Sequence, residues 1–232
     1  PIVVGGTGLY IDSLISGLDF ADNTSDNALR DKLGAEYDNL GGEAMLARLA
    51  QFDPERAAKL HPGDKRRIVR AIEIYLLTGT TITEHDRITA ARLKRYDAAR
   101  IVLNYADRAD LYARIDARVD AMEQAGLADE VRALLASGLS PDCTAMQAIG
   151  YKEIAAFLEG KTTEREAFDL IKQSSRRYAK RQLTWFGRWK DALRIVWDKV
   201  PNMEKARHAS TEFLHSRVYH NAGHPDDGCD TL

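Results

Sequence analysis

The first seventeen residues constrain the fold more than any other segment. A wholly apolar run, Pro1–Val4, leads into the glycine turn Gly5–Gly8, and an apolar helical pattern follows from Leu9 to about Gly17. A short apolar run of this kind predicts a buried strand. The order strand, turn, helix predicts an α/β core. Because the first residues already form a strand, we expect a fragment of a larger sheet whose N-terminal part is missing.

Two later segments are also predicted to be strands, and the rest of the chain is mainly helical. Arg100–Tyr105 and Ala192–Trp197 are the later strands, since they are short, apolar and β-branched. The predicted helices are Leu29–Tyr37, Gly42–Gln51, Pro54–Leu60, Lys65–Leu77, Asp107 to Gly126, Leu127–Gly138, Gly150–Leu158 and Thr163–Trp189, with one short helix after Val200. We therefore expect an α/β core in residues 1–18 and 99–200, a helical insertion domain in 19–98, and a C-terminal helix with a flexible tail in 201–232.

Composition excludes several classes of protein. Apolar residues make up 44% of the chain, enough to build a core, so general disorder is excluded. No apolar run approaches the roughly 20 residues of a membrane helix, and no signal peptide is evident. The two cysteines, Cys143 and Cys229, lack metal-ligand spacing, and no Ser/His/Asp set stands out. A reducing, cytoplasmic environment is the simplest expectation.

Positive charge is concentrated in two segments of the chain. Residues 172–194 hold eight basic side chains against Asp191 alone, and residues 56–70 hold six against Asp64. On a helical wheel the basic side chains of the first segment share one half, backed by aromatic residues that we expect to be core. Such a stripe is typical of RNA-backbone binding. For the second segment, a merely solvated helix face is an equally good interpretation.

Two elements have the chemistry of anion sites. In the turn Gly5–Gly8 the glycines permit close approach to a ligand, and the helix N-terminus that follows attracts phosphate. The turn lacks the Gly-Lys-Ser/Thr of a nucleotide P-loop, and a plain tight turn is the alternative. Arg114 and Arg118 lie one turn apart, with Arg108 nearby, and a pyrophosphate suits such paired guanidinium groups. Their alternative is surface pairing with Asp110 and Asp116.

Six segments together resemble the tRNA dimethylallyltransferase (tRNA isopentenyltransferase) family of bacterial type. In chain order they are PIVVGGTGLYIDSLISGL, DPERAAKLHPGDKRRIVRAIEIYLLTG, RIDARVDAM, GLADEVRALL, AMQAIGYKEI and RRYAKRQLTWF. The resemblance implies a P-loop-kinase-like parallel-sheet core with a helical insertion domain that grips the tRNA anticodon arm. It also implies transfer of a dimethylallyl group from dimethylallyl diphosphate to N6 of the adenosine on the 3′ side of the anticodon. Mg²⁺ would help to bind the diphosphate, and the protein would be a monomer.

The resemblance assigns site residues motif by motif. Thr7 and Arg30 are the expected catalytic residues, and Thr7 with Arg118, Arg114 and Arg108 would bind the diphosphate. The expected tRNA contacts are Arg66, Arg67, Ile68, Val69 and Arg70, then Gln147, Ala148, Ile149, Gly150, Tyr151 and Lys152, then Lys180, Arg181, Gln182, Thr184, Trp185 and Arg188. This chain has Gly187 where the family often has arginine.

The family's P-loop and the Asp-Ser segment that follows it have no counterpart in these residues. The general base and the metal ligands are therefore not assigned to this chain, and Asp12 and Asp19 are not promoted to the role. We expect the chain alone to have little or no transferase activity. The main alternative is a non-catalytic RNA-binding remnant of the family. A kinase or NTPase fragment of related fold is a weaker alternative, since a small acceptor does not need the basic stripe of residues 172–194.

Overall fold

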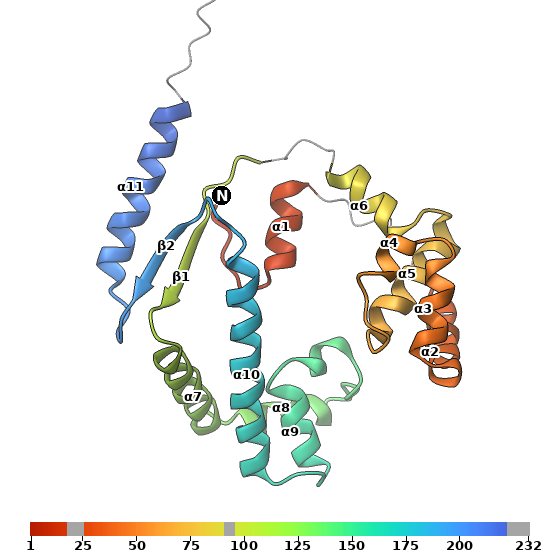
Figure 1. The fold of residues 1–232 in the computed structure, drawn as a ribbon. Coiled ribbons are helices and arrows are strands. Elements are labelled where there is room, and N and C mark those ends of the chain that lie inside the picture. The colour runs from red at the N-terminus through yellow and green to blue at the C-terminus, as the bar shows by residue number, and fades with distance from the viewer. Residues whose placement is uncertain (18–25, 91–95, 222–232) are drawn as a thin grey trace, which may run out of the picture. The chain divides into compact units, whose positions relative to one another are not determined.

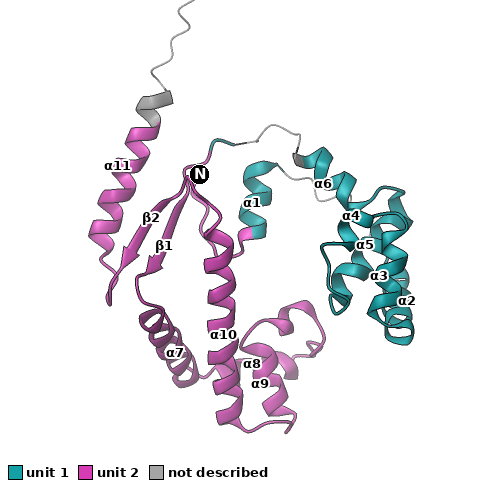
Figure 2. Ribbon diagram, viewed as in Figure 1, with its two compact units in different colours: residues 1, 9–97 teal, residues 2–8, 98–232 magenta. Residues whose placement is uncertain are grey.

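The computed structural model describes residues 1–17, 26–90 and 96–221. Its contacts divide the chain into two compact units (Figure 2). Unit 1 comprises Pro1 and Leu9–Asp97, and unit 2 comprises Ile2–Gly8 and Ala98–Leu232. The expected domain boundary at residues 18 and 19 and the last part of the expected C-terminal segment, residues 222–232, lie outside the described residues. The domain limits therefore stay predictions.

Unit 1 is a small helical assembly. Its helices are α1 (Gly8–Ser16, of which Gly8 belongs to unit 2), α2 (Asn27–Leu40), α3 (Gly42–Ala50), α4 (Pro54–Ala57), α5 (Lys65–Thr78) and α6 (Ile82–Ala90) (Figure 1). Helices α2 to α5 enclose a core built from one apolar stripe of each: Leu33, Met45, Leu49, Ala57, Ile68, Val69, Ala71 and Ile72. The stripes follow helical spacing, which is why sequence periodicity indicates these helices.

Polar side chains set the helix limits in unit 1. The side chain of Asp26 accepts the backbone N–H groups of Ala28 and Leu29 and so caps α2. Asp53 caps α4 and also accepts hydrogen bonds from Thr83, which joins α6 to the same carboxylate. Gly79 ends α5 with a φ of +71°, a left-handed conformation that favours glycine.

Unit 2 combines a small sheet with a second helical core. In chain order it contains β1 (Ile101–Tyr105), α7 (Arg108–Gln124), α8 (Leu127–Ala136), the 3₁₀ helix η1 (Thr144–Gln147), α9 (Tyr151–Leu158), α10 (Glu164–Phe186), β2 (Leu193–Trp197) and α11 (Met203–Asn221). The core lies where α7, α8 and α9 pack with the first half of α10. Its buried residues are Val119, Leu127, Val131, Met146, Ile154, Ala155, Ala167, Phe168 and Ile171.

The sheet of unit 2 consists of β1 and β2, which are the strands that the described residues contain. They pair in parallel from Ile101 opposite Leu193 to Tyr105 opposite Trp197. The long connection between them carries α7 to α10, as a parallel crossover requires. The expected parallel pairing of strands is confirmed, as a two-stranded sheet within a mostly helical fold.

Two predictions about the chain ends were wrong. Pro1–Val4 is not a strand, and Ile2 and Val4 are 93% and 91% exposed rather than buried. A strand exists only when its backbone groups are paired, and within the described part of the chain β1 and β2 pair only with each other. The helix after Val200 is not short, because α11 has 19 residues. Among the described residues no helix combines the length and the apolar character of a membrane-spanning segment.

Candidate functional site

The glycine turn of residues 5–8 is seated directly on α10. A β-carbon on Gly6 would lie 2.0 Å from Nε2 of Gln182, and one on Gly8 would lie 2.0 Å from Cδ1 of Trp185. Neither position has a left-handed φ, so glycine is needed here for close approach. The glycines therefore let the turn lie against the helix.

The hydroxyl of Thr7 is exposed at the top of this turn. Its Oγ1 lies 3.3 Å from the hydroxyl oxygen of Tyr178, within hydrogen-bond distance. Tyr178, Gln182 and Trp185 are spaced four and three residues apart, so they share one face of α10. This face positions Thr7 and leaves it open to a ligand.

Helix α7 lies antiparallel to α10, because residue numbers rise on one helix as they fall on the other along their ion pairs. Asp116 pairs with Arg176 at 2.5 Å, and Asp120 pairs with Lys172 at 2.5 Å. These pairs place the middle and second half of α7 beside the middle and first half of α10.

The same ion pairs decide the state of the predicted diphosphate arginines. The surface alternative paired these arginines with Asp110 and Asp116, but Asp116 is bound to Arg176 of α10, and no ion pair among the described residues involves Asp110. Arg108, Arg114 and Arg118 are exposed, and none has an ion pair with a described carboxylate. Three guanidinium groups on one helix thus have no ion-pair partner among the described residues, which is compatible with binding an external anion.

The basic residues of α10 fall into two groups. Lys172 and Arg176 are engaged with α7, and the hydrogen bond to Asp120 raises the pKa of Lys172. Arg177, Lys180 and Arg181 are exposed, and no described carboxylate pairs with them. Arg188 follows this second group just beyond the end of α10. Its guanidinium group lies over the Trp185 ring, 4.0 Å from the ring centroid.

The other predicted tRNA contacts of α10 are less available. Gln182 and Trp185 abut the glycine turn, and the hydroxyl of Thr184 donates to the carbonyl oxygen of Lys180. A β-carbon at Gly187 would lie 2.9 Å from the carbonyl oxygen of Leu183. Only Lys180, Arg181 and Arg188 of this group are cations on the exposed surface.

In unit 1 the residues of the predicted tRNA-contact stretch 66–70 differ in how far they are exposed. Arg66 and Arg67 are exposed, and Arg70 is half-buried. Ile68 and Val69 are 0% and 5% exposed, so their side chains support the helix and cannot reach RNA. Arg30, assigned by resemblance to the active site, donates from Nε and Nη2 to Glu73 of α5 at 3.1 and 3.0 Å. Burial favours a raised pKa for Glu73, but the hydrogen bonds from Arg30 and Arg70 outweigh it and hold that pKa below its usual value.

The segment Gln147–Lys152 forms the turn into α9. Gly150 has a φ of +107°, and its N–H donates to the buried carboxylate of Glu153 at 2.8 Å. Gln147, Ala148 and Lys152 are exposed, Ile149 packs against the core of unit 2, and the Tyr151 hydroxyl donates to Glu130. That contact raises the pKa of Tyr151. Backbone and polar atoms at this turn are accessible to a partner.

No residue set in the described part of the chain fits a protein-held metal. Groups of three or more His, Cys, Asp or Glu that could hold an ion are absent from it. Mg²⁺ often binds through substrate phosphates and water with few protein ligands. The candidate site supplies cations and hydroxyl groups, which suit the phosphate oxygens of a diphosphate.

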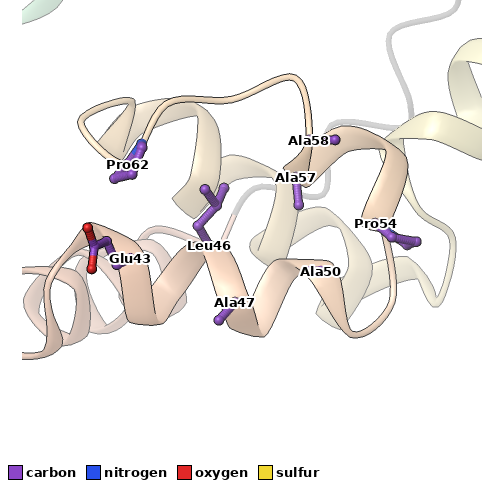
Figure 3. A pocket seen from close by; sticks show the side chains of 8 residues that line it. All are labelled: Glu43, Leu46, Ala47, Ala50, Pro54, Ala57, Ala58 and Pro62. Atoms are coloured by element: carbon purple, nitrogen blue, oxygen red, sulfur yellow. The ribbon is translucent and has the colours of Figure 1, made fainter.

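Unit 1 also has an open apolar groove. Figure 3 shows its lining, and its volume is about 410 Å³. The lining residues come from α3, α4 and the segments beside α4: Glu43, Leu46, Ala47, Ala50, Pro54, Ala57, Ala58 and Pro62. It contains none of the predicted site residues.

The sequence patterns do not identify three residues that contact predicted site residues or the basic stripe of α10. Tyr178 falls among the aromatic residues expected to be core, Asp116 was one of two partners in the alternative interpretation of the α7 arginines, and Glu73 had no predicted role. Glu73 and Arg30 are 43 residues apart, and Asp116 and Arg176 are 60 apart. The one available signal was a glutamate within the apolar stripe of α5, between Ile72 and the end of that helix.

Comparison with known proteins identifies the class of molecule. The sequence model of the IPP transferase family matches residues 1–189. That match spans the glycine turn, the arginines of α7 and all of α10. The chain therefore belongs to the IPP transferase, or tRNA dimethylallyltransferase, family of transferases that modify tRNA.

Individual relatives and a solved structure support the same family. The tRNA dimethylallyltransferase of Thermoanaerobacter sp. (strain X514) is 41% identical over 219 residues, which are 94% of this chain and 70% of that protein. The one from Exiguobacterium sp. (strain ATCC BAA-1283 / AT1b) is 50% identical over 186 residues, 80% of this chain and 58% of that protein. The crystal structure of the full-length tRNA isopentenylpyrophosphate transferase from Bacillus halodurans has a TM-score of 0.59 and 36% identity, covering 94% of this chain and 68% of that one. The chain thus spans 58% to 70% of the length of these relatives.

Proposed function

We propose that this chain carries the leaving-group site and the RNA-binding surface of a tRNA dimethylallyltransferase. The dimethylallyl group of dimethylallyl diphosphate would be transferred to N6 of the adenosine adjacent to the anticodon on its 3′ side. The observation that carries the proposal is the glycine turn seated on α10, because it joins an exposed hydroxyl to a helix lined with unpaired cations.

The chemistry requires stabilisation of a leaving diphosphate. The N6–carbon bond forms as the carbon–oxygen bond to the diphosphate breaks, and the diphosphate departs with the electron pair. Thr7 would donate to a diphosphate oxygen, while Arg114 and Arg118 would offset the growing negative charge. Arg108, at the first turn of α7, would assist. The proton released from N6 is assigned to no residue of this chain.

The RNA would be held by the exposed cations of α10 and α5. Arg177, Lys180 and Arg181 offer phosphate contacts, and such contacts give affinity without reading the bases. Arg66, Arg67 and Arg70 would do the same from unit 1. The target adenosine has to leave the stack of the anticodon loop before N6 can react. The turn at Gln147–Lys152 would contact the loop.

The proposal includes Mg²⁺ bound mainly through the diphosphate, a monomer as the working state and a cytoplasmic location. The alternative, an RNA-binding remnant, shares the cationic surface of α10. It differs because it requires no role of Thr7 or Arg118 in catalysis or diphosphate binding.

The test is transfer of labelled dimethylallyl diphosphate to an unmodified anticodon stem-loop with Mg²⁺. The chain is assayed with and without a relative's P-loop segment supplied in trans. Label that appears only with that segment, and that falls at least tenfold in the variant Thr7→Val, supports the proposal. Salt-dependent RNA binding without label under either condition would establish the remnant instead.

A further inference from the structure

Glu73 is a fully buried carboxylate in the middle of α5, a helix whose other buried side chains are apolar. It is 0% exposed and lies in α5 directly after Ile72, a core residue of unit 1. Burying an ionised carboxylate is costly unless it is paired and hydrogen-bonded. An apolar residue of similar volume would usually serve the core at least as well. The charge at this position therefore requires an explanation beyond packing.

The carboxylate is shared by two arginines from different helices. Arg30 of α2 approaches it with Nε and Nη2, at 3.1 Å from Oε2 and 3.0 Å from Oε1. Arg70, one turn earlier on α5, donates from Nη1 to Oε2 at 3.0 Å. The first contact is a two-pronged fork, which fixes the plane of the guanidinium group. Glu73 thus holds two cationic groups in one arrangement.

The two arginines remain partly open to solvent. Their side chains are 42% and 38% exposed, whereas the glutamate between them is not exposed at all. A guanidinium group has five N–H donors. Arg30 spends two of them on Glu73 and Arg70 spends one, and no other described residue accepts from either. Most of the donors are left for an external acceptor.

We propose that Glu73 is a positioning residue that orients Arg30 and Arg70 as one clamp for an RNA backbone phosphate. Two positive groups with one negative group leave a net positive charge at the surface of unit 1. Arg66, one turn before Arg70 on α5, is exposed and has no described ion pair, so it extends the same cationic face. The inference rests on the proposed function, because it needs RNA as the partner. Arg30, which the resemblance places at the active site, is then a contact to the RNA backbone.

The direction in which RNA affinity changes distinguishes a positioning role of Glu73 from a purely electrostatic effect of its charge. In Glu73→Gln an acidic group is lost, so electrostatics alone would strengthen RNA binding. If Glu73 acts through the arginines, affinity for an unmodified anticodon stem-loop falls about tenfold. The slope of log affinity against log salt also becomes shallower by about one, since at least one phosphate contact is lost. The matched control is Glu36→Gln, which removes the ion pair with Arg48 in the same unit.

A double-mutant cycle gives the decisive measurement. In a background of Arg30→Gln and Arg70→Gln, the change Glu73→Gln is expected to alter RNA affinity less than twofold, because the groups it positions are gone. An equal loss in both backgrounds would show that Glu73 is only structural. Unchanged or tighter binding of the single variant would also overturn the proposal.

Two further arms keep the test informative. Dimethylallyl diphosphate binding is measured without RNA, and a loss confined to that arm would assign the clamp to the diphosphate and refute the RNA role. If circular dichroism shows that Glu73→Gln is unfolded, Arg30→Lys and Arg70→Lys replace it, since each keeps a cation beside Glu73 but lacks the fork. Each is expected to lower RNA affinity at least threefold, and unchanged affinity would contradict the clamp.

Failure of this inference differs from failure of the proposed function. If the parent chain shows no salt-dependent stem-loop binding, the proposed function fails and the clamp fails with it. If the parent binds and Glu73→Gln binds equally well, only the role of Glu73 is lost.

Discussion

Trp185 lies so close to Gly8 that a single added carbon would collide with its indole ring. The separation between a β-carbon at Gly8 and Cδ1 of Trp185 would be 2.0 Å. Gly6 stands in the same relation to the amide of Gln182. A residue predicted to contact tRNA and a turn predicted to bind diphosphate are therefore in direct contact, and α10 couples the two proposed binding surfaces of unit 2.

The change Gly8→Ala is expected to displace the glycine turn from α10. Forcing an extra carbon into a packed contact typically costs about 1–3 kcal/mol, and a rigid indole yields less readily than a flexible chain. Transfer activity in the assay with the P-loop segment should fall as well, because the displaced turn contains Thr7. Urea unfolding and label transfer are the measurements.

The control is Gly34→Ala in the interior of α2. A β-carbon there would meet only Cε of Lys65 at 3.9 Å, so the change should stabilise the helix by about 0.5–1 kcal/mol. Equal effects of the two substitutions would contradict the close contact between Gly8 and Trp185.

Cations of α10 should contribute to RNA binding according to their internal pairing. Lys180→Ala and Arg181→Ala are each expected to lower stem-loop affinity and to reduce the salt slope by about one, because these side chains have no described carboxylate partner. Lys172→Ala should leave the slope unchanged, since that ammonium is bound to Asp120. Binding titrations at several salt concentrations measure both. A uniform effect of all three would show that total charge, and not pairing, controls binding.

Arg114 and Arg118 should act on the diphosphate and not on the RNA. Replacing either by alanine is expected to weaken dimethylallyl diphosphate binding about tenfold, as for a lost charge-assisted hydrogen bond. Calorimetry without RNA gives the affinity. Arg132→Ala is the matched control, because Arg132 is an exposed helical arginine already paired with Asp129. Loss of stem-loop affinity with normal diphosphate affinity would reverse the assignment.

Unit 1 should lose stability in acid through Glu73. Its pKa is held below the usual 4.5, with burial opposing and the hydrogen bonds from Arg30 and Arg70 prevailing. A carboxyl group with a lowered folded-state pKa stabilises the fold above its unfolded-state pKa, and this contribution is lost as the pH falls through the folded-state pKa. Thermal melts from pH 6 down to pH 3 should therefore show a smaller drop for Glu73→Gln than for the parent.

The control for the acid experiment is Glu55→Gln. The pKa of Glu55 is also lowered, first by the hydrogen bond from Lys59, but this carboxylate is exposed and solvent screens its contribution. An identical acid response for both variants would mean that the buried pair adds nothing to the pH dependence.

Local sequence signals were sufficient for most helices and for the two strands that pair. Asp107 precedes α7, Thr163 caps α10 with Glu166 in return, and Gly79 ends α5, so each boundary is encoded within a few residues. Motif spacing also indicated the family, which the comparisons show. Strand formation at Pro1–Val4 could not be decided in this way, because a strand depends on a partner elsewhere in the chain.

The positions of the cations and of most helices can be read from the sequence, since they depend on neighbouring residues and on periodicity. The availability of those cations for a partner depends on the tertiary structure. Asp116 engages Arg176 and Asp120 engages Lys172, whereas Glu73 holds two partly exposed arginines in place, one of them 43 residues away. Ion pairs between distant segments depend on how helices pack, and packing brings together residues whose spacing along the chain carries no local signal. The division between structural and available charge on α10 and α5 is therefore a property of the fold.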